Sequence, residues 1–427
     1  MFKGRRSKLS QAEYESVRLQ DILKEEAIEV HFQPLVSIQE KSVVGFEGLS
    51  RGVEMPSGRL IPPVVLIRKA VEEDLSLELD ALFRKKVFQS FREQFYQQPR
   101  MILTVNLETN LGGETPQDSL ELDTFSKLSQ RYEIDPARVA IEIVESKTKN
   151  THLLERFVEA QKERGFMVAL DDVGSGHSNL DRIARMKPDL IKIDRSLILD
   201  LHKEYHKQEV FRSLVGLSRQ IGALVVAEGV ETEEEALWSL ELGADILQGY
   251  YFARPQRMDG GLFDRNEDLI EEVGRKFRSM LLGTLHDKRE MHRRCEARLA
   301  ALRKSLKKVK PKAFDGHISD LLKENPDFEA VYILDEAGVQ VTHMAHVEHD
   351  VPEHRRVFCK PWERGTDHSL RDFFCRLAQG DPKDQTHVTD PYVSLATGRR
   401  CVTLSTFFRD AYDRVYVLCV DMKVEAL

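Results

Sequence analysis

Two adjacent carboxylates end an apolar segment near the middle of the chain. Residues 167–173 read MVALDDV, and a Gly-Ser-Gly turn follows. Asp171 and Asp172 therefore stand where a buried strand is expected to end. Carboxylates that leave water must be paired, hydrogen-bonded or bound to a metal ion. No cation close in the sequence neutralises this pair, so its partners must come from other segments.

Seven further β-rich segments alternate with helix-like segments in the first 255 residues. The eight predicted strands are 31–38, 43–51, 102–108, 139–145, 167–173, 190–194, 224–230 and 245–252. Eight strands in about 225 residues favour a (β/α)8 barrel. The short turn between the first two strands predicts that they pair antiparallel. An open doubly wound sheet is the alternative, but no GxGxxG sequence follows an early strand.

Polar side chains that can bind cations recur at the ends of these strands. In a parallel barrel the carboxyl ends of the strands form one rim, where functional residues gather. A single carboxylate at such a position is usually solvated or caps a helix. The set predicted for this rim is Glu47, Asn106, Glu142, Asp171, Asp172, Lys192, Glu228 and Gln248, with Glu231 just beyond. One lysine cannot balance so many acids, so we expect divalent cations there.

The ligand types indicate which cations and which chemistry. Oxygen ligands without Cys or His favour Mg²⁺ or Mn²⁺ over Zn²⁺. Two such ions about 3.5 to 4 Å apart cleave phosphodiesters by holding the attacking and leaving oxygens. We expect Asp171 and Asp172 each to face a different ion. Lys192 shares a strand face with Asp194 and can orient water or steady phosphoryl charge, although a structural ion pair is the alternative.

Composition sets limits on partners and location. The net charge of -8 argues against general DNA binding. No apolar run approaches the length of a membrane span, and no signal peptide is evident, so we expect a cytoplasmic protein. The five cysteines are odd in number and lack CxxC spacing, which predicts free thiols.

Three regions are predicted along the chain. Residues 1–258 form the barrel, 259–312 form a charge-rich linker helix, and 313–427 form a small α+β domain with an antiparallel sheet. The basic stretch KSLKKVKPK is interpreted as a solvated helix end. His343, His346, His349 and His354 are spaced like metal ligands, but a polar loop is the favoured interpretation.

The motifs resemble those of the EAL-domain family of cyclic di-GMP phosphodiesterases. FQPLV, GFEGLSR, VNLE, IEIVES, LDDVGSG, PDLIKID, VVAEGVET and LQGYYFARP occur in the family's order between residues 20 and 257. The resemblance implies a (β/α)8 barrel that hydrolyses cyclic di-GMP to linear pGpG with two Mg²⁺ or Mn²⁺ ions. No signature of a cyclic di-GMP synthase accompanies it.

The resemblance also implies roles for individual residues. The implied metal ligands are Glu47, Asn106, Glu142, Asp171 and Asp172. The implied catalytic residues are Glu47, Asp172, Lys192 and Glu228, and the choice between Lys192 and Glu228 as general base stays open. The implied substrate-binding residues are Gln33, Leu49, Arg51, Asp194, Glu231, Gln248 and Pro255. Glu145 matches the acid that stabilises the loop after the fifth strand.

The sequence departs from the family pattern in two places. Gly48 replaces the alanine of the name-giving motif, and because both are small we expect little effect. The loop 172–179 differs at Val173, Ser175, His177 and Asn179, which puts the turnover rate in question more than metal binding. His177 as a metal ligand is not favoured.

The whole arrangement is similar to the YkuI-like subgroup, in which a PAS- or Cache-like sensory domain follows the barrel. This similarity implies a homodimer and an unknown small-molecule or protein signal at the C-terminal domain. A catalytically silent cyclic di-GMP receptor that signals through the linker helix is the first alternative. An interaction scaffold that binds no nucleotide is the second.

Overall fold

The computed structural model describes residues 11–95, 100–107, 116–144, 151–176, 180–258, 262–347, 363–378, 386–394 and 399–424. The chain divides into two compact units, Met1–Leu281 and Leu282–Leu427. The predicted three-part division, with boundaries at 258 and 312, stays a prediction. None of the helices in the described ranges has the length and apolar character that a membrane span requires.

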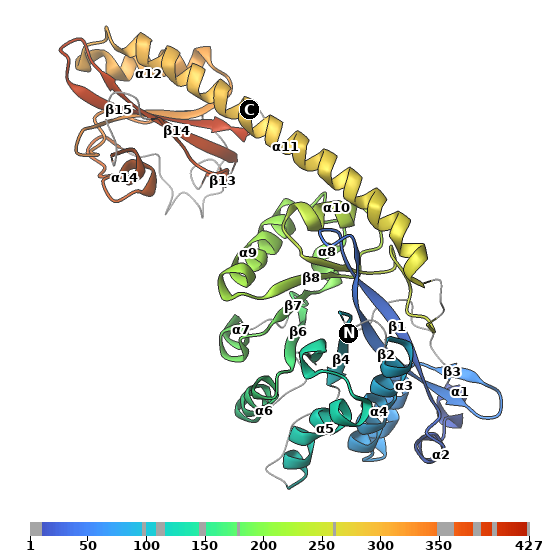
Figure 1. Cartoon of the computed structure of the whole chain (residues 1–427). Helices are drawn as coiled ribbons and strands as arrows, with labels where there is room; N and C mark the ends of the chain where they lie inside the picture. The colour runs from blue at the N-terminus through green and yellow to red at the C-terminus, as the bar shows by residue number, and fades with distance from the viewer. Residues whose placement is uncertain are drawn as a thin grey trace. The chain divides into compact units, whose positions relative to one another are not determined.

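The first unit contains a closed barrel with helices around it (Figure 1). Its strands are β1 (Ile28–Ser37), β2 (Ser42–Glu54), β3 (Arg59–Ile61), β4 (Ile102–Leu107), β5 (Val139–Val144), β6 (Met167–Val173), β7 (Leu190–Ile193), β8 (Leu224–Glu228) and β9 (Ile246–Gln248). The order is β1-β9-β8-β7-β6-β5-β4-β2-β3, and β1 also pairs with β2, which closes the barrel. The β1–β2 and β1–β9 pairings are antiparallel and those from β2 and β4 through β9 are parallel.

The predicted barrel with its antiparallel first pair is therefore confirmed. Two details differ from the predicted strands. β2 extends to Glu54 and pairs with the additional strand β3. β9 ends at Gln248, because the chain turns at Gly249, where the backbone of Val230 approaches too closely for any side chain.

Helices connect the strands and cover the barrel. The helices are α1 (Gln11–Ser16), α2 (Leu19–Lys24), α3 (Pro63–Glu72), α4 (Ser76–Phe95), α5 (Pro116–Tyr132), α6 (Thr151–Glu163), α7 (Leu180–Met186), α8 (Arg195–Ile198), α9 (Tyr205–Ile221), α10 (Glu233–Glu241), α11 (Leu262–Leu306), α12 (Phe314–Glu324) and α14 (Asp372–Ala378). α9 ends on Gly222 in the left-handed conformation, a common helix stop.

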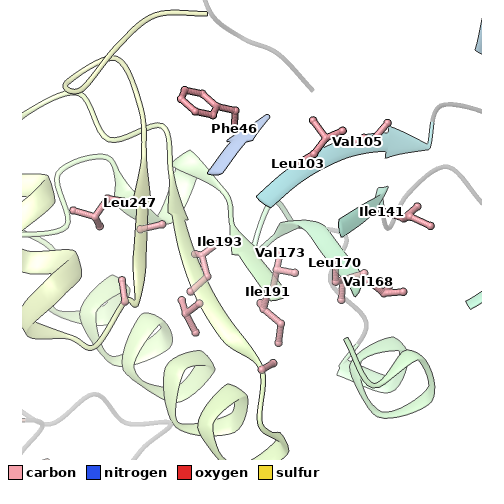
Figure 2. Close-up of a cluster of buried hydrophobic side chains, with 14 of the residues drawn as sticks. Phe46, Leu103, Val105, Ile141, Val168, Leu170, Val173, Ile191, Ile193 and Leu247 are labelled. Carbon is pink, nitrogen blue, oxygen red and sulfur yellow. The ribbon is translucent and has the colours of Figure 1, made fainter. Parts of the chain in front are cut away.

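The side chains of the barrel strands alternate between two faces, and each face lines a separate buried region. Outward-facing side chains such as Leu103, Ile141 and Ile191 form the main core between the barrel wall and the helices (Figure 2). Inside the barrel, a second and smaller cluster includes Ala140 and Leu190. The polar residues described below also lie on the inward face, so an apolar cluster and a polar one share the interior of the barrel.

The second unit is built on a six-stranded antiparallel sheet. Its strands are β10 (Phe328–Asp335), β11 (Ala345–His346), β12 (Thr386–Val388), β13 (Tyr392–Val393), β14 (Arg400–Arg409) and β15 (Val415–Lys423). The order is β11-β10-β15-β14-β12, with β13 on β14. One sheet face packs on α12 and the end of α11, and the other packs on α14. The predicted antiparallel domain is confirmed.

Helix α11 contributes to the cores of both units. Ile270 and Val273 belong to the core around the barrel, whereas Leu299 and Leu302 belong to the core of the sheet domain. The predicted long helix is confirmed.

Candidate functional site

One lysine and four carboxylates meet inside the barrel. The Nζ atom of Lys192 lies 2.6 Å from Glu142 Oε1 and 2.6 Å from Glu228 Oε1. The same atom lies 3.6 Å from Asp171 Oδ1 and 3.7 Å from Glu47 Oε2. Lys192 is only 1% exposed, so these charges interact with little screening by water. We call Glu47, Glu142, Asp171, Asp172, Lys192 and Glu228 the acidic centre.

A β-bulge brings both adjacent aspartates to this centre. Leu170 pairs with Ile191 and Val173 pairs with Ile193, so two residues of β6 lie opposite the single residue Lys192 of β7. Asp172 accommodates the extra residue with a positive φ of 56°, a left-handed conformation that Asp tolerates better than most residues. The bulge explains how neighbours in sequence escape the alternation that would separate them.

Three of the acids form a compact group. Ligand oxygens of Asp171, Asp172 and Glu228 all lie within 4.8 Å of one another. The Oδ1 atom of Asp171 is buried and accepts no hydrogen bond within the described part of the chain. An unsatisfied buried oxygen inside a group of acids is what a cation site requires of its ligands.

Amide side chains hold Glu47 in place. Asn106 Nδ2 donates to Glu47 Oε1 at 2.9 Å, and Gln248 Nε2 donates to Glu47 Oε2 at 2.6 Å. Gln248 Nε2 also lies 3.3 Å from Gln33 Oε1, and Gln33 Nε2 donates to the Ala253 carbonyl at 3.1 Å. These bonds fix both oxygens of Glu47 and connect the acidic centre to the turn after β9.

The electrostatics show an excess of negative charge. Burial, together with Glu47 and Asp171, raises the pKa of Glu142 to about 8 despite the attraction of Lys192. Burial and the neighbouring carboxylates also raise the pKa values of Asp171 and Glu228. For Lys192, burial disfavours the charged form, but the four acids outweigh it and raise its pKa well above the usual value.

For Glu47 the balance is reversed. Burial raises its pKa, but Lys192, Gln248 and Asn106 together outweigh burial and lower it. Glu47 therefore stays ionised, whereas the raised pKa values of Glu142, Asp171 and Glu228 favour their protonated forms. A divalent cation would lower these pKa values again, since it favours the ionised form of every carboxylate it contacts.

Charge counting shows how much positive charge the acidic centre lacks. Fully ionised, the five acids of the centre carry five negative charges and Lys192 carries one positive charge. Two divalent cations would neutralise the remaining four. The donor set of carboxylates and an amide matches Mg²⁺ or Mn²⁺.

Other predicted residues lie around the centre. Gln33 and Leu49 are buried, and Arg51, which is partly buried, donates from Nη1 to the Ser50 carbonyl. Burial lowers the pKa of Arg51, although Glu47 and Tyr250 partly offset this. Pro255 is partly buried in the turn after β9.

Two predicted substrate-binding residues have structural partners in this state. Asp194 caps α8, because its Oδ1 accepts from the Ser196 N–H at 2.9 Å. Glu231 pairs with Arg195. Glu145, His177, Asn179, His349 and His354 lie outside the described residues. Within the described ranges, the group of side chains that could hold a metal ion is Asp171, Asp172 and Glu228 of the acidic centre. Neither His343 nor His346 belongs to such a group.

Gly48 packs directly against helix α4. A Cβ atom at this position would lie 2.4 Å from Val87 Cγ1 on α4, far inside contact distance. Valine is stiff at χ1 in a helix and cannot easily move aside. The small effect expected of glycine at this position stays a prediction, whereas an alanine here would collide with Val87.

Sequence reasoning also missed residues at the rim. A Cβ at Gly229 would lie 2.7 Å from the Arg195 side chain, so glycine lets Arg195 cross the loop after β8 and reach Glu231. Tyr250 and Arg254 were missed as well, and the guanidinium carbon of Arg254 lies 4.2 Å from the centroid of the Tyr250 ring. The available signal was that all four missed residues lie within two positions of the predicted residues Asp194, Glu228, Gln248 and Pro255.

A family model described as "EAL domain" matches residues 16–255, which is more than half of the chain. The chain belongs to the EAL family. The Probable cyclic di-GMP phosphodiesterase PdeB of Escherichia coli is 28% identical over 237 residues, which are 56% of this chain and 44% of that protein. The cyclic di-GMP phosphodiesterase RocR of Pseudomonas aeruginosa is 31% identical over 53% of this EAL chain and 57% of RocR.

Similarity that extends beyond the EAL domain is found with YkuI of Bacillus subtilis. This uncharacterised EAL-domain protein is 26% identical over 73% of this chain and 75% of its own length. The crystal structure of YkuI, solved with cyclic di-GMP and calcium, matches with a TM-score of 0.78 at 22% identity and covers 95% of this chain and 99% of that one. The fold of the EAL barrel followed by a sheet domain is thus shared. The chain spans less than half the length of the first curated relatives it matches.

Proposed function

We propose that this EAL-family chain is a metal-dependent phosphodiesterase that hydrolyses one phosphodiester of cyclic di-GMP to linear pGpG. The observation that carries the proposal is the uncompensated charge of the acidic centre, five acids against one lysine. The names of the relatives PdeB and RocR support the substrate. So does the PaMucR phosphodiesterase in complex with c-di-GMP, which matches at a TM-score of 0.50 and 25% identity over 56% of this chain.

In this proposal the acids divide between two cations. Glu47, Asn106, Glu142 and Asp171 would hold one Mg²⁺ or Mn²⁺, and Asp172 would hold the second. When bound, the cations polarise the phosphoryl group and make water a better nucleophile. The bulge in β6 makes the division possible, since it presents Asp171 and Asp172 from successive positions toward the same side.

The chain's own groups position the reactants. Lys192 carries a proton and contacts two carboxylates at 2.6 Å, so it acts as a donor that orients water and steadies developing phosphoryl charge. Glu228 contacts Lys192 at 2.6 Å and lies beside Asp171 and Asp172, so it is the better placed proton acceptor. Arg51 suits a phosphate oxygen, and Gln33 and Gln248 keep Glu47 aligned.

We also propose that the C-terminal sheet domain regulates the barrel through α11 and that the protein acts as a homodimer. The support for regulation through α11 is that residues of this helix belong to both cores. A change in either core would therefore act on the same helix. The signal recognised by the sheet domain is an unidentified small molecule or protein.

The test uses the full chain with cyclic di-GMP and Mn²⁺ or Mg²⁺, followed by separation of the products. We expect pGpG, and no pGpG when EDTA is present. Binding of cyclic di-GMP without any pGpG would replace the enzyme by the receptor alternative. No binding at all would refute the nucleotide assignment and favour the scaffold.

A further inference from the structure

The end of helix α11, in the second unit, is followed and overlapped by a run of exposed lysines. No acidic residue occurs between Glu296 and Asp315. The lysines of this stretch are all exposed, and within the described ranges none of their side chains forms an ion pair or a hydrogen bond; they are Lys304, Lys307, Lys308, Lys310 and Lys312. Their exposure agrees with the predicted solvated helix end. They also create a strong positive field in a chain whose net charge is -8.

The hairpin between β14 and β15 lies against this stretch. The Ala411 N–H in the hairpin loop donates at 3.2 Å to the carbonyl of Val309, which stands between two of the lysines. Beyond the lysines, the ring of Phe314 packs edge-on against Phe408 and Tyr416 of the two hairpin strands, at centroid distances of 5.7 and 5.1 Å. A backbone hydrogen bond and aromatic packing therefore hold the hairpin loop beside the lysines.

The hairpin loop presents an aromatic ring at this surface. Tyr412 follows Ala411 directly and is 58% exposed. Its N–H donates to Asp410 Oδ1 at 2.8 Å, and the guanidinium carbon of Arg414 lies 5.1 Å from its ring centroid. A tyrosine has an apolar ring and a polar hydroxyl group, so it suits a boundary between water and an apolar phase. We call Tyr412 and the five lysines the basic patch.

The acids beside the basic patch already have cationic partners. Each forms an ion pair with an arginine of the same unit; the pairs are Asp410–Arg414, Asp413–Arg409 and Asp315–Arg364. These pairs offset the charge of the three arginines. The positive excess of this surface therefore comes from the lysines.

We infer that the basic patch docks on the surface of an anionic phospholipid bilayer. The lysine ammonium is a point charge on a flexible stem, which suits the diffuse negative charge of lipid headgroups. A nucleic acid would instead favour unpaired arginines, which bind phosphates and guanines in a bidentate manner, whereas the arginines here are paired with acids. The exposed Tyr412 ring adds a side chain of the kind that lies at the headgroup level. This inference goes beyond the proposed function and requires no membrane-spanning helix.

The experiment sediments the full chain with vesicles of phosphatidylcholine and phosphatidylserine in a ratio of about 2:1, and with vesicles of phosphatidylcholine alone. We expect binding to the anionic vesicles that weakens as salt is added, and little binding to the neutral ones. Each lysine near an anionic surface strengthens binding roughly fivefold, so Lys307→Glu/Lys308→Glu/Lys310→Glu should weaken it by at least about 30-fold. Tyr412→Ala should weaken it by about 3- to 10-fold.

A second triple variant makes the same change of net charge away from the basic patch. It replaces by glutamate three exposed lysines, Lys203, Lys288 and Lys323. Its binding to the anionic vesicles should stay within about threefold of the parent chain, because salt screens charges that lie far from the membrane surface. Circular dichroism and thermal unfolding should be unchanged in every variant, since all the altered side chains are exposed.

Four results would overturn the inference. Two are a parent chain that does not bind the anionic vesicles, and one that binds neutral vesicles equally well. An equal loss in the two triple variants would show that net charge acts rather than the basic patch. Tighter binding to a short DNA duplex than to the vesicles, lost in the variant of the basic patch, would assign this surface to nucleic acid. None of these results depends on hydrolysis of cyclic di-GMP, so the proposed function is tested separately.

Discussion

The barrel and the C-terminal sheet both bury carboxylates, but they neutralise them differently. In the sheet, Asp421 is 4% exposed and its Oδ1 accepts from Thr403 Oγ1 at 2.7 Å. Glu329 is fully buried and lies 3.6 Å from Lys423 Nζ and 3.8 Å from Arg399 Nη1. One hydroxyl and two cations of the same domain thus lie beside these two acids.

The acidic centre of the barrel has one lysine for five acids. Four of them share that lysine, and the buried Asp171 Oδ1 accepts no hydrogen bond within the described ranges. The comparison teaches that burial of an acid is a poor sign of function. An excess of buried acids over their partners is the more informative one, because it must be balanced by bound protons or by an added cation.

Removing a carboxylate ligand from the acidic centre is expected to have the largest effect on activity. Glu47→Gln or Asp171→Asn is expected to lower the rate of pGpG formation by at least about a hundredfold, since each takes an oxygen ligand from the centre. Glu209→Gln, which alters an exposed acid paired with Arg212 on α9, serves as the control and should keep full activity. Near-normal rates in both centre variants would refute the site.

The sheet domain should instead respond to pH. Burial raises the pKa of Asp421 from 3.8 to about 6, so between these values the folded state holds a proton that the unfolded chain has released. The free energy of unfolding of this domain should therefore fall as pH rises from about 4 to about 6, by up to about 3 kcal/mol.

Calorimetry of the full chain over this pH range, in parallel with Asp421→Asn, measures the effect. The substituted chain should lack this slope, because its amide does not titrate. A slope of the same size in both proteins would show that another group is responsible.

Metal ions should stabilise the barrel and not the sheet. At a Mn²⁺ concentration a hundred times its Kd, the gain in the free energy of unfolding is about 2.7 kcal/mol per site. For a domain of this size that corresponds to a rise in Tm of about 5 to 10 °C. Calorimetry with Mn²⁺ and then with EDTA should move the barrel transition up and back, and Asp171→Asn should lose most of the shift. A shift confined to the sheet domain would contradict the comparison.

The smallest effect concerns packing behind the centre. Gly48→Ala should destabilise the barrel by about 1 to 3 kcal/mol, because the new Cβ meets Val87. Gly216→Ala, in α9 with nothing within 4 Å of the added atom, should instead stabilise by about 0.5 to 1 kcal/mol. Denaturant unfolding of both variants and of the double variant Gly48→Ala/Val87→Ala measures the coupling. Equal effects in the two single variants would exclude the proposed collision.

Much of the barrel followed from the alternation of β-rich and helix-like segments along the chain. Asn106, Glu142 and Lys192 were expected to lie together because the carboxyl ends of parallel barrel strands form one rim. The structure places these three residues around one centre. The antiparallel first pair followed from the short connection after residue 38.

Other features depend on contacts that no periodic pattern encodes. The collision at Gly48 depends on Val87, which lies in a different element of the chain. The stacking of Arg254 on Tyr250 arises in an irregular turn, where a spacing of four residues has no fixed meaning. The sequence analysis expected Asp171 and Asp172 each to face an ion but did not predict the bulge, because its geometry depends on how β6 pairs with β7.

The bulge in β6 decides on which face of the strand the next side chain lies. Val173 is 1% exposed and belongs to the outer core only because Asp171 and Asp172 together occupy the place of one residue. Deleting either aspartate would restore regular pairing and keep Val173 on the outer face, since Leu170, one aspartate and Val173 would lie opposite Ile191, Lys192 and Ile193. The bulge therefore serves the second carboxylate and not the barrel wall. A lineage that loses catalysis could delete one of these acids without turning any other side chain of the strand.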